Sequence, residues 1–123
     1  GFDVFLTKFD NDGEELWARQ WGTILSDIGY SVAVDSSGNV FVTGFTLRDI
    51  DTGGFDIFLT KFDNNGKQFW TKQWGTGWYS AGYSAAVDSS DNVYITGMLD
   101  GDYNSAHTDI FLVKTDNDGE FLE

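Results

Sequence analysis

The sequence of 123 residues contains neither cysteine nor proline. Without cysteine, disulfide bonds and thiolate metal sites are excluded. Without proline, the turns have to be built by Gly, Asn, Asp and Ser, and glycine occurs 15 times. No stretch keeps a 3.6-residue apolar period for three turns, which disfavours helix. No apolar run approaches the roughly 18 residues of a membrane-spanning helix, so we expect no membrane insertion.

Basic residues are also scarce, with 7 Lys and Arg against 20 Asp and Glu and a net charge of −13. Such a charge repels a phosphate backbone, so we expect no nucleic-acid partner. The hydrophobic content of 41% and the aromatic content of 17% are nevertheless enough for a packed core. This apolar content argues against a disordered chain.

The feature that organises the chain is an internal repeat with a 53-residue period. The segment Gly1–Asp10 returns almost unchanged as Gly54–Asp63, and a third copy enters at Asp109. Two tryptophans and a Gly-Tyr-Ser string recur at the same offset, as Trp17 and Trp70, Trp21 and Trp74, and 29–31 and 82–84. Repetition at such a period indicates an architecture built from one repeated unit.

Each repeat predicts four short strands that are rich in β-branched and aromatic residues. In the first copy we expect these strands over Asp3–Phe9, Glu15–Trp21, Tyr30–Asp35 and Val40–Phe45. Tight turns rich in Asn, Asp, Gly and Ser separate the first strand from the second and the third from the fourth. Four antiparallel strands in a unit of this length are typical of a β-propeller blade, so the predicted fold class is all-β, a partial propeller.

Three repeated strings resemble the bacterial SBBP repeat, a family named for β-propellers. They are Asp-x-Phe-Leu-x-Lys-x-Asp-x-x-Gly, Trp-x-x-Gln-x-Gly-Thr and Val-Asp-x-x-x-Asn-Val-x-x-Thr-Gly. The resemblance implies a propeller fold, a secreted or cell-surface location, and a strand order in which Tyr30–Asp35 is innermost and Phe69–Trp74 outermost. One departure from the repeat is Asp91, which stands where the first copy has Gly38.

On this strand order the chain divides into parts of three blades within one propeller domain. Residues 1–22 form the outer two strands of a first blade, 23–75 a complete second blade, and 76–123 a third blade with a truncated outer strand. A propeller usually needs four or more blades to close. The expected partners are therefore further blades, either from the same longer chain or from identical chains.

The loops at one end of the blades differ between the copies, whereas the hairpin turns at the other end repeat. Divergent loops on a fixed scaffold often carry binding. Their mixture of aromatic and acidic side chains suits a carbohydrate or protein ligand. The candidate ligand-binding residues are Asp27, Asp49, Asp51, Trp78, Tyr79, Asp100, Asp102, Tyr103 and His107.

Two acidic turns are weak candidates for Ca²⁺, and no other cofactor is expected. Their acidic residues are Asp10, Asp12 and Glu14 in the first copy and Asp116, Asp118 and Glu120 in the third. Calcium usually takes six to eight oxygen ligands, more than these turns supply, and the middle copy has Lys67 in place of Glu14. A tight hairpin turn is the favoured interpretation.

The sequence favours a non-catalytic module for binding or structural scaffolding within a larger secreted or cell-surface protein or assembly. It has no Gly-x-Ser-x-Gly elbow and no phosphate-binding glycine loop. Lys8, Lys61 and Lys114 recur in every copy, which argues for a role in the blade such as pairing between blades. Two alternatives stay open: a segment of a glycan-active propeller enzyme with its catalytic site elsewhere, and an engineered or excised self-assembling fragment.

Overall fold

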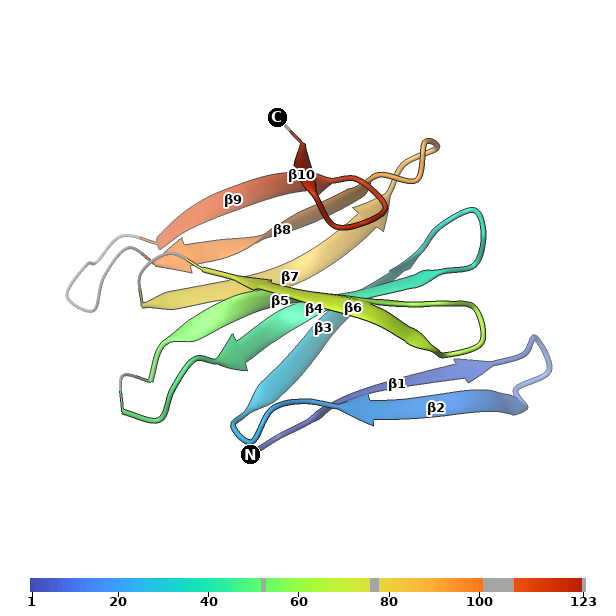
Figure 1. Ribbon diagram of the computed structural model, residues 1–123, viewed down its shortest axis with the longest axis horizontal. Helices are drawn as coiled ribbons and strands as arrows, with labels where there is room; N and C mark the ends of the chain where they lie inside the picture. Colours follow the sequence, from blue (N-terminus) through green and yellow to red (C-terminus); the bar gives the residue numbers. More distant parts are fainter. Residues whose placement is uncertain (52, 76–77, 101–107, 123) are drawn as a thin grey trace.

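A computed structural model describes residues 1–51, 53–75, 78–100 and 108–122, and these residues form strands, turns and loops (Figure 1). The strands are β1 (Val4–Phe9), β2 (Glu15–Trp21), β3 (Asp27–Val34), β4 (Val40–Leu47), β5 (Phe55–Phe62), β6 (Gln68–Trp74), β7 (Tyr79–Val87), β8 (Val93–Asp100), β9 (Thr108–Thr115) and β10 (Phe121–Leu122). Within these ranges no helix is long and apolar enough to cross a membrane.

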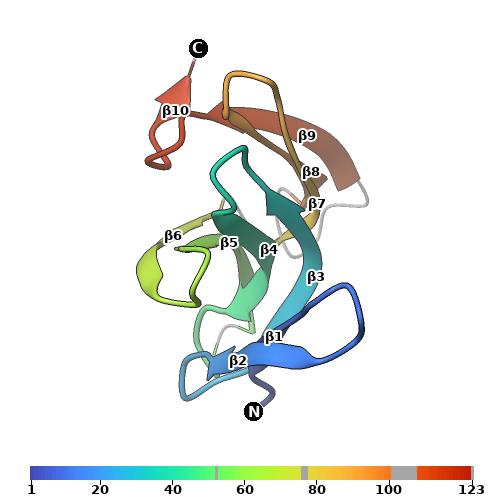
Figure 2. The same ribbon diagram turned by 90° about the vertical axis from the view of Figure 1, so that its right-hand side faces the viewer.

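Antiparallel pairing groups the strands into three units. Blade 2 is complete, with β3 to β6 paired in sequence order. Blade 1 consists of β1 and β2, and blade 3 of β7 to β10. Figure 2 shows the three groups one above another. The predicted all-β fold of four-stranded antiparallel blades is confirmed.

The third strand of each repeat begins earlier than the sequence pattern indicates. We expected it to start at Tyr30, but β3 starts at Asp27, and β4 continues to Leu47 rather than ending at Phe45. The cause is a β-bulge, because Gly29 pairs with Gly44 and Ser31 with Thr43, which leaves Tyr30 as the extra residue. A β-bulge shifts the alternation by one residue and hides the first part of the strand from a period-two search.

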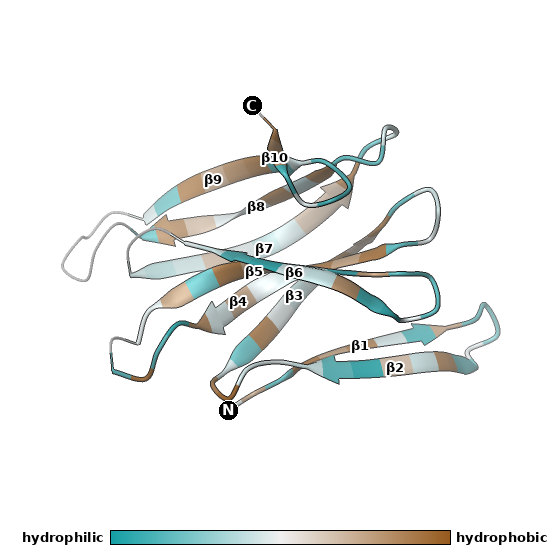
Figure 3. Ribbon diagram, viewed as in Figure 1, coloured by the Kyte–Doolittle hydropathy of each residue, from teal (hydrophilic) through white to brown (hydrophobic). Residues whose placement is uncertain are grey.

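Apolar side chains from neighbouring blades form two core clusters. Between blades 1 and 2 the cluster contains Val4, Val40, Val42, Phe58 and Phe62. Between blades 2 and 3 it contains Phe41, Leu59, Val93 and Ile95. Figure 3 shows the hydrophobic colouring along β4, β5 and β9. Blade 2 is therefore packed on both faces, which is the arrangement inside a propeller.

The hairpin turns lie together at the right-hand end of Figure 1. In each turn the preceding aspartate closes the loop, as Asp10 Oδ1 accepts the N–H groups of Asp12 and Glu14 at 2.9 Å. The same pair of bonds recurs at Asp35, Asp63, Asp88 and Asp116. Glycines with φ of 82° to 87° occupy four of these turns, and Asp91, with φ of 63°, occupies the other.

Candidate functional site

A continuous row of aromatic rings begins in blade 3, passes through blade 2 and returns to blade 3. It runs through Tyr83, Tyr30, Phe45, Phe55, Tyr79 and Trp78, with successive ring centroids 5.1, 5.7, 4.6, 5.2 and 6.0 Å apart. A single parallel bridge between Phe55 and Tyr79 joins the two blades beside this row. Packed rings of this kind form a large, rigid apolar surface.

The two tyrosines that begin the row are the residues that the β-bulges displace. Tyr30 is the extra residue of β3 and Tyr83 that of β7, so each lies at the same place in its blade. About half of each side chain is exposed, and the Tyr83 hydroxyl donates to the Met98 sulfur at 3.4 Å. The bulges thus bring two phenol rings together on strands β3 and β7 of neighbouring blades.

A cavity of about 110 Å³ adjoins the row. Its wall includes Phe45, Phe55, Tyr79, Tyr83 and Met98, and its lining is almost entirely apolar. Tyr79 was predicted as a binding residue at this end of the molecule, whereas Tyr30, Phe45, Phe55 and Tyr83 were not. The recurring Gly-Tyr-Ser string was the available signal, because a repeated tyrosine beside a glycine marks a special backbone position.

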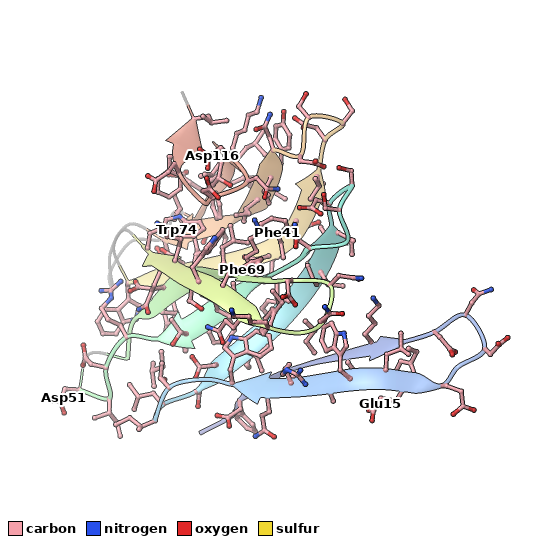
Figure 4. All side chains as sticks on the ribbon, turned by 45° about the vertical axis from the view of Figure 1, so that its right-hand side comes forward. Glu15, Phe41, Asp51, Phe69, Trp74 and Asp116 are labelled. Carbon is pink, nitrogen blue, oxygen red and sulfur yellow. The ribbon has the colours of Figure 1, made fainter. Side chains whose placement is uncertain are left out.

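The structure separates the acidic candidates of the loop end. Asp27 is buried, and its Oδ2 accepts the N–H and hydroxyl of Thr23, so its assignment to an open loop was wrong. Asp27 is the first residue of β3, where it pairs with Thr46 of β4. Asp51 is exposed at an outer tip of the molecule (Figure 4), and Asp49 is partly exposed nearby.

The remaining candidates lie at or beyond the end of β8. Asp100 is the last residue of that strand and pairs with Tyr79, while its carbonyl accepts the N–H of Trp78 at 3.1 Å. Asp102, Tyr103 and His107 lie outside the described residues. The structure therefore brings Trp78, Tyr79 and Asp100 together and leaves Asp27 within the blade.

The candidate calcium turns are hairpin turns in the structure. The Oδ1 atoms of Asp10 and Asp116 are both engaged with backbone N–H groups of their own turns. Among the described residues, no three acidic or histidine side chains are grouped as metal ligands. Of the two interpretations given to these turns, the geometry matches the tight turn.

At the hairpin end, a lysine of one blade forms hydrogen bonds to a turn of the next blade at both junctions. Lys8 in β1 donates to the Asn64 side-chain oxygen at 2.5 Å, and Lys61 in β5 donates to that of Asn117 at 2.5 Å. Arg19 adds a bond to the Gly66 carbonyl at 2.7 Å in blade 2 and lies 5.5 Å from the Trp17 ring. Trp21, which alternates with Trp17 and Arg19 along β2, packs edge-on against Phe62 of blade 2.

The junction between blades 2 and 3 also contains a carboxyl group with a shifted pKa. Burial raises the pKa of Asp35, but hydrogen bonds from Asn117, Asn39 and the backbone outweigh it, so the pKa is held below its usual value. Asn117 belongs to the third blade, and its Nδ2 lies 3.0 Å from the Asp35 Oδ2 in the second. Asp35 thus joins two blades and is stabilised as the carboxylate.

These repeating blades, with their inner bulges and interlocked turns, define a segment of a β-propeller. Residues 16–53 match the sequence model of the family described as "Beta-propeller repeat" (SBBP), and the chain contains a repeat of this family.

Two curated relatives are similar over most of the chain. It is 30% identical over 112 residues to the regulatory protein FlaEY of Caulobacter vibrioides, which covers 81% of this chain and 12% of that protein. It is 27% identical over 113 residues to the uncharacterized WD repeat-containing protein L264 of Acanthamoeba polyphaga mimivirus, covering 78% of this chain and 8% of that protein. The chain therefore corresponds to a small part of each relative's length.

Proposed function

We propose that the chain is a non-catalytic scaffold and binding segment of a larger β-propeller, in which further blades of the same repeat cover its two open faces. One comparison carries this proposal. Phe5 in blade 1 is 77% exposed, whereas its equivalent in blade 2, Phe58, is 4% exposed. At the other end, Ile110 is 87% exposed and its equivalent Ile57 is fully buried.

The open faces have the chemistry of unfinished blade junctions. Phe9 and Leu112 are also exposed, although their equivalents Phe62 and Leu59 are buried. Burying one such side chain contributes roughly 1.5–3 kcal/mol, so leaving several exposed is costly. Lys114 is the equivalent of Lys61 and Asn11 the equivalent of Asn117, so each open face carries one half of the lysine–asparagine contact.

The binding part of the proposal rests on the loop end, where the aromatic row and its cavity provide a rigid apolar surface next to Asp100, the cross-strand partner of Tyr79. A carbohydrate or a protein segment fits this combination. The two aspartates of the described chain with shifted pKa values, Asp35 and Asp88, are both shifted downward by hydrogen bonds. A general acid needs the opposite shift, which favours a non-catalytic role. The description of FlaEY as regulatory is in keeping with binding. From the family resemblance, we further propose that the module lies outside the cytoplasm.

The test is the mass in solution of the 123-residue chain, measured by light scattering after size exclusion over a range of concentrations. We expect self-association, reduced by Phe5→Ser or Ile110→Ser but unchanged by Ile24→Ser, which replaces an even more exposed residue of a loop. A discrete ring would show that identical chains supply the missing blades. Open-ended association would show that a longer chain supplies them. A monodisperse monomer at every concentration would contradict the proposal.

A further inference from the structure

A second pocket, of about 300 Å³, lies in the wedge between blades 1 and 2 and shares no residue with the cavity beside the aromatic row. Val4, Trp21 and Phe58 form an apolar wall. The polar part of the lining comes from Asp27, Thr46, Thr71, Gln68 and Gln73. This volume is at the lower end of the range for small-molecule sites.

The most informative side chain of this pocket is Thr46. It is 3% exposed, and its hydroxyl has no hydrogen-bond partner. The other buried threonines of the described chain are satisfied: Thr43 donates to the Phe58 carbonyl, Thr60 bonds to Thr71, and Thr115 donates to the Asp116 carbonyl. A buried hydroxyl without a partner is destabilising, so its presence on a pocket wall points to a ligand that would satisfy it.

Asp27 is the cross-strand neighbour of Thr46 and lines the same pocket. Its two side-chain hydrogen bonds, to the N–H and hydroxyl of Thr23, both fall on Oδ2. Its Oδ1 has no partner among the described residues. The free oxygen of the Asp27 carboxylate and the buried hydroxyl of Thr46 thus both line the pocket with unused hydrogen-bonding capacity.

Blade packing does not require these polar groups. One repeat later, between blades 2 and 3, Ser80 stands for Asp27, Leu99 for Thr46 and Phe121 for Gln68. The Phe121 ring packs edge-on against Trp74 at 5.3 Å, the tryptophan equivalent to Trp21. Two of the polar side chains that line the wedge between blades 1 and 2 are thus replaced by apolar ones, Leu99 and Phe121, at the next junction.

We propose that the pocket between blades 1 and 2 binds the ring of a neutral sugar, with Asp27 and Thr46 as its hydrogen-bonding anchors. The pocket offers one carboxylate among hydroxyl and amide groups, a mixture that needs a ligand able both to donate and to accept. Sugar hydroxyl groups do both, whereas a cation only attracts acceptors. The C–H face of the ring packs against the Trp21 side of the pocket.

Ligand-observed NMR by saturation transfer tests this proposal on the whole chain, with glucose, galactose, mannose and N-acetylglucosamine as probes. Tetrahydropyran, the same six-membered ring without hydroxyl groups, is the negative probe. We expect transfer to at least one sugar and none to tetrahydropyran. Asp27→Ser, which installs the residue of the next repeat, is expected to weaken binding at least tenfold.

A pair of threonine variants separates ligand binding from folding. Thr46→Val is expected to weaken sugar binding at least threefold without lowering the melting temperature, because it removes a hydroxyl with no partner. Thr43→Val, in the same strand, is expected to lower the melting temperature and leave sugar binding unchanged. The proposal would be overturned if no sugar received saturation transfer, or if binding survived both Asp27→Ser and Thr46→Val. A lower melting temperature for Thr46→Val would also overturn it.

Discussion

Lys61 in the second blade donates to both the side-chain and the main-chain oxygen of Asn117 in the third blade, at 2.5 and 3.0 Å. One repeat earlier, Lys8 makes the same two bonds to Asn64. The lysine and the turn asparagine are therefore two halves of a clasp that recurs at each blade junction. Lys61 is 6% exposed and lies about equally far from the Phe41 and Phe69 rings, at 5.5 and 5.3 Å. Figure 4 labels these two phenylalanines.

The buried clasp should contribute more to stability than the exposed one. Lys61→Met keeps the length of the side chain but removes its charged hydrogen bonds, and we expect a loss of about 2 kcal/mol in the free energy of unfolding. Lys8→Met, at the partly exposed junction, should cost less than about 1 kcal/mol. Urea unfolding measures both values. Equal losses would show that burial does not strengthen this contact.

Two turn glycines of identical conformation differ only in their neighbours. Gly13 and Gly66 have φ of 87° and 83°, but an added Cβ would meet nothing within 4 Å at Gly13 and the Trp17 ring at 2.8 Å at Gly66. Gly13→Ala should cost about 1–2 kcal/mol from backbone strain alone. Gly66→Ala should cost at least about 1 kcal/mol more because the ring of the preceding blade has to move. Unfolding curves of the two variants measure this difference, and equal stability of the two variants would contradict the prediction.

Asp91 has a left-handed backbone conformation, and its side chain also joins its own turn to the turn that contains Ser36. Its carboxylate accepts the Ser36 N–H at 2.9 Å and the Ser36 hydroxyl at 2.5 Å. Asp91→Ala removes these bonds and keeps the strain, whereas Asp91→Gly removes both. We therefore expect the alanine variant to be about 1 kcal/mol less stable than the glycine variant. Thermal unfolding of the pair isolates the strain, and a glycine variant as unstable as the alanine one would rule it out.

Asp35 should make the protein sensitive to acid. Its pKa is below the usual value of 3.8 in the folded chain, so the unfolded chain binds the proton more readily in acid. The carboxylate thus stabilises the fold above pH 3.8, and this stabilisation is lost as the pH falls through the lower folded pKa. Asp35→Asn should cost roughly 1–3 kcal/mol at pH 7.

Melting temperatures of the wild type and of Asp35→Asn between pH 7 and pH 2.5 provide the measurement. The gap between the two proteins should shrink toward the acid end, because protonation removes from the wild type what the variant already lacks. Asp88, whose pKa is also lowered, remains in both proteins and keeps some acid sensitivity in each. A gap that stays constant over this range would show that the charge of Asp35 is not what stabilises the junction.

Much of the blade could be predicted because its signals are local. The Asp-Asn-x-Gly turns need a carboxylate that closes the loop and a residue that accepts positive φ, and both requirements are visible in the residues themselves. The start of β3 could not be predicted, because the bulge at Tyr30 depends on pairing with Gly44 in another strand. Local alternation carries no record of that partner.

The candidate site was harder to predict for the same reason. Trp78 and Tyr79 were found at the loop end, but the row that they complete passes through Phe45 and Tyr30, which were read as ordinary strand residues. The role of Thr46 depends on having no partner, and only the positions of its neighbours reveal this. The expectation that the repeated lysines pair between blades is met at Lys8 and Lys61.

The sequence by itself determined the repeat, the strands, the turns and the all-β propeller fold, because each of these follows from residue types at fixed short spacings. Only the tertiary structure decided which faces are buried, which lysine meets which asparagine and which junction keeps a polar pocket. Asp27 and Ser80 occupy equivalent positions one repeat apart, and both are buried. What differs is the set of side chains around them, because neighbouring blades meet through residues that are far apart in the chain.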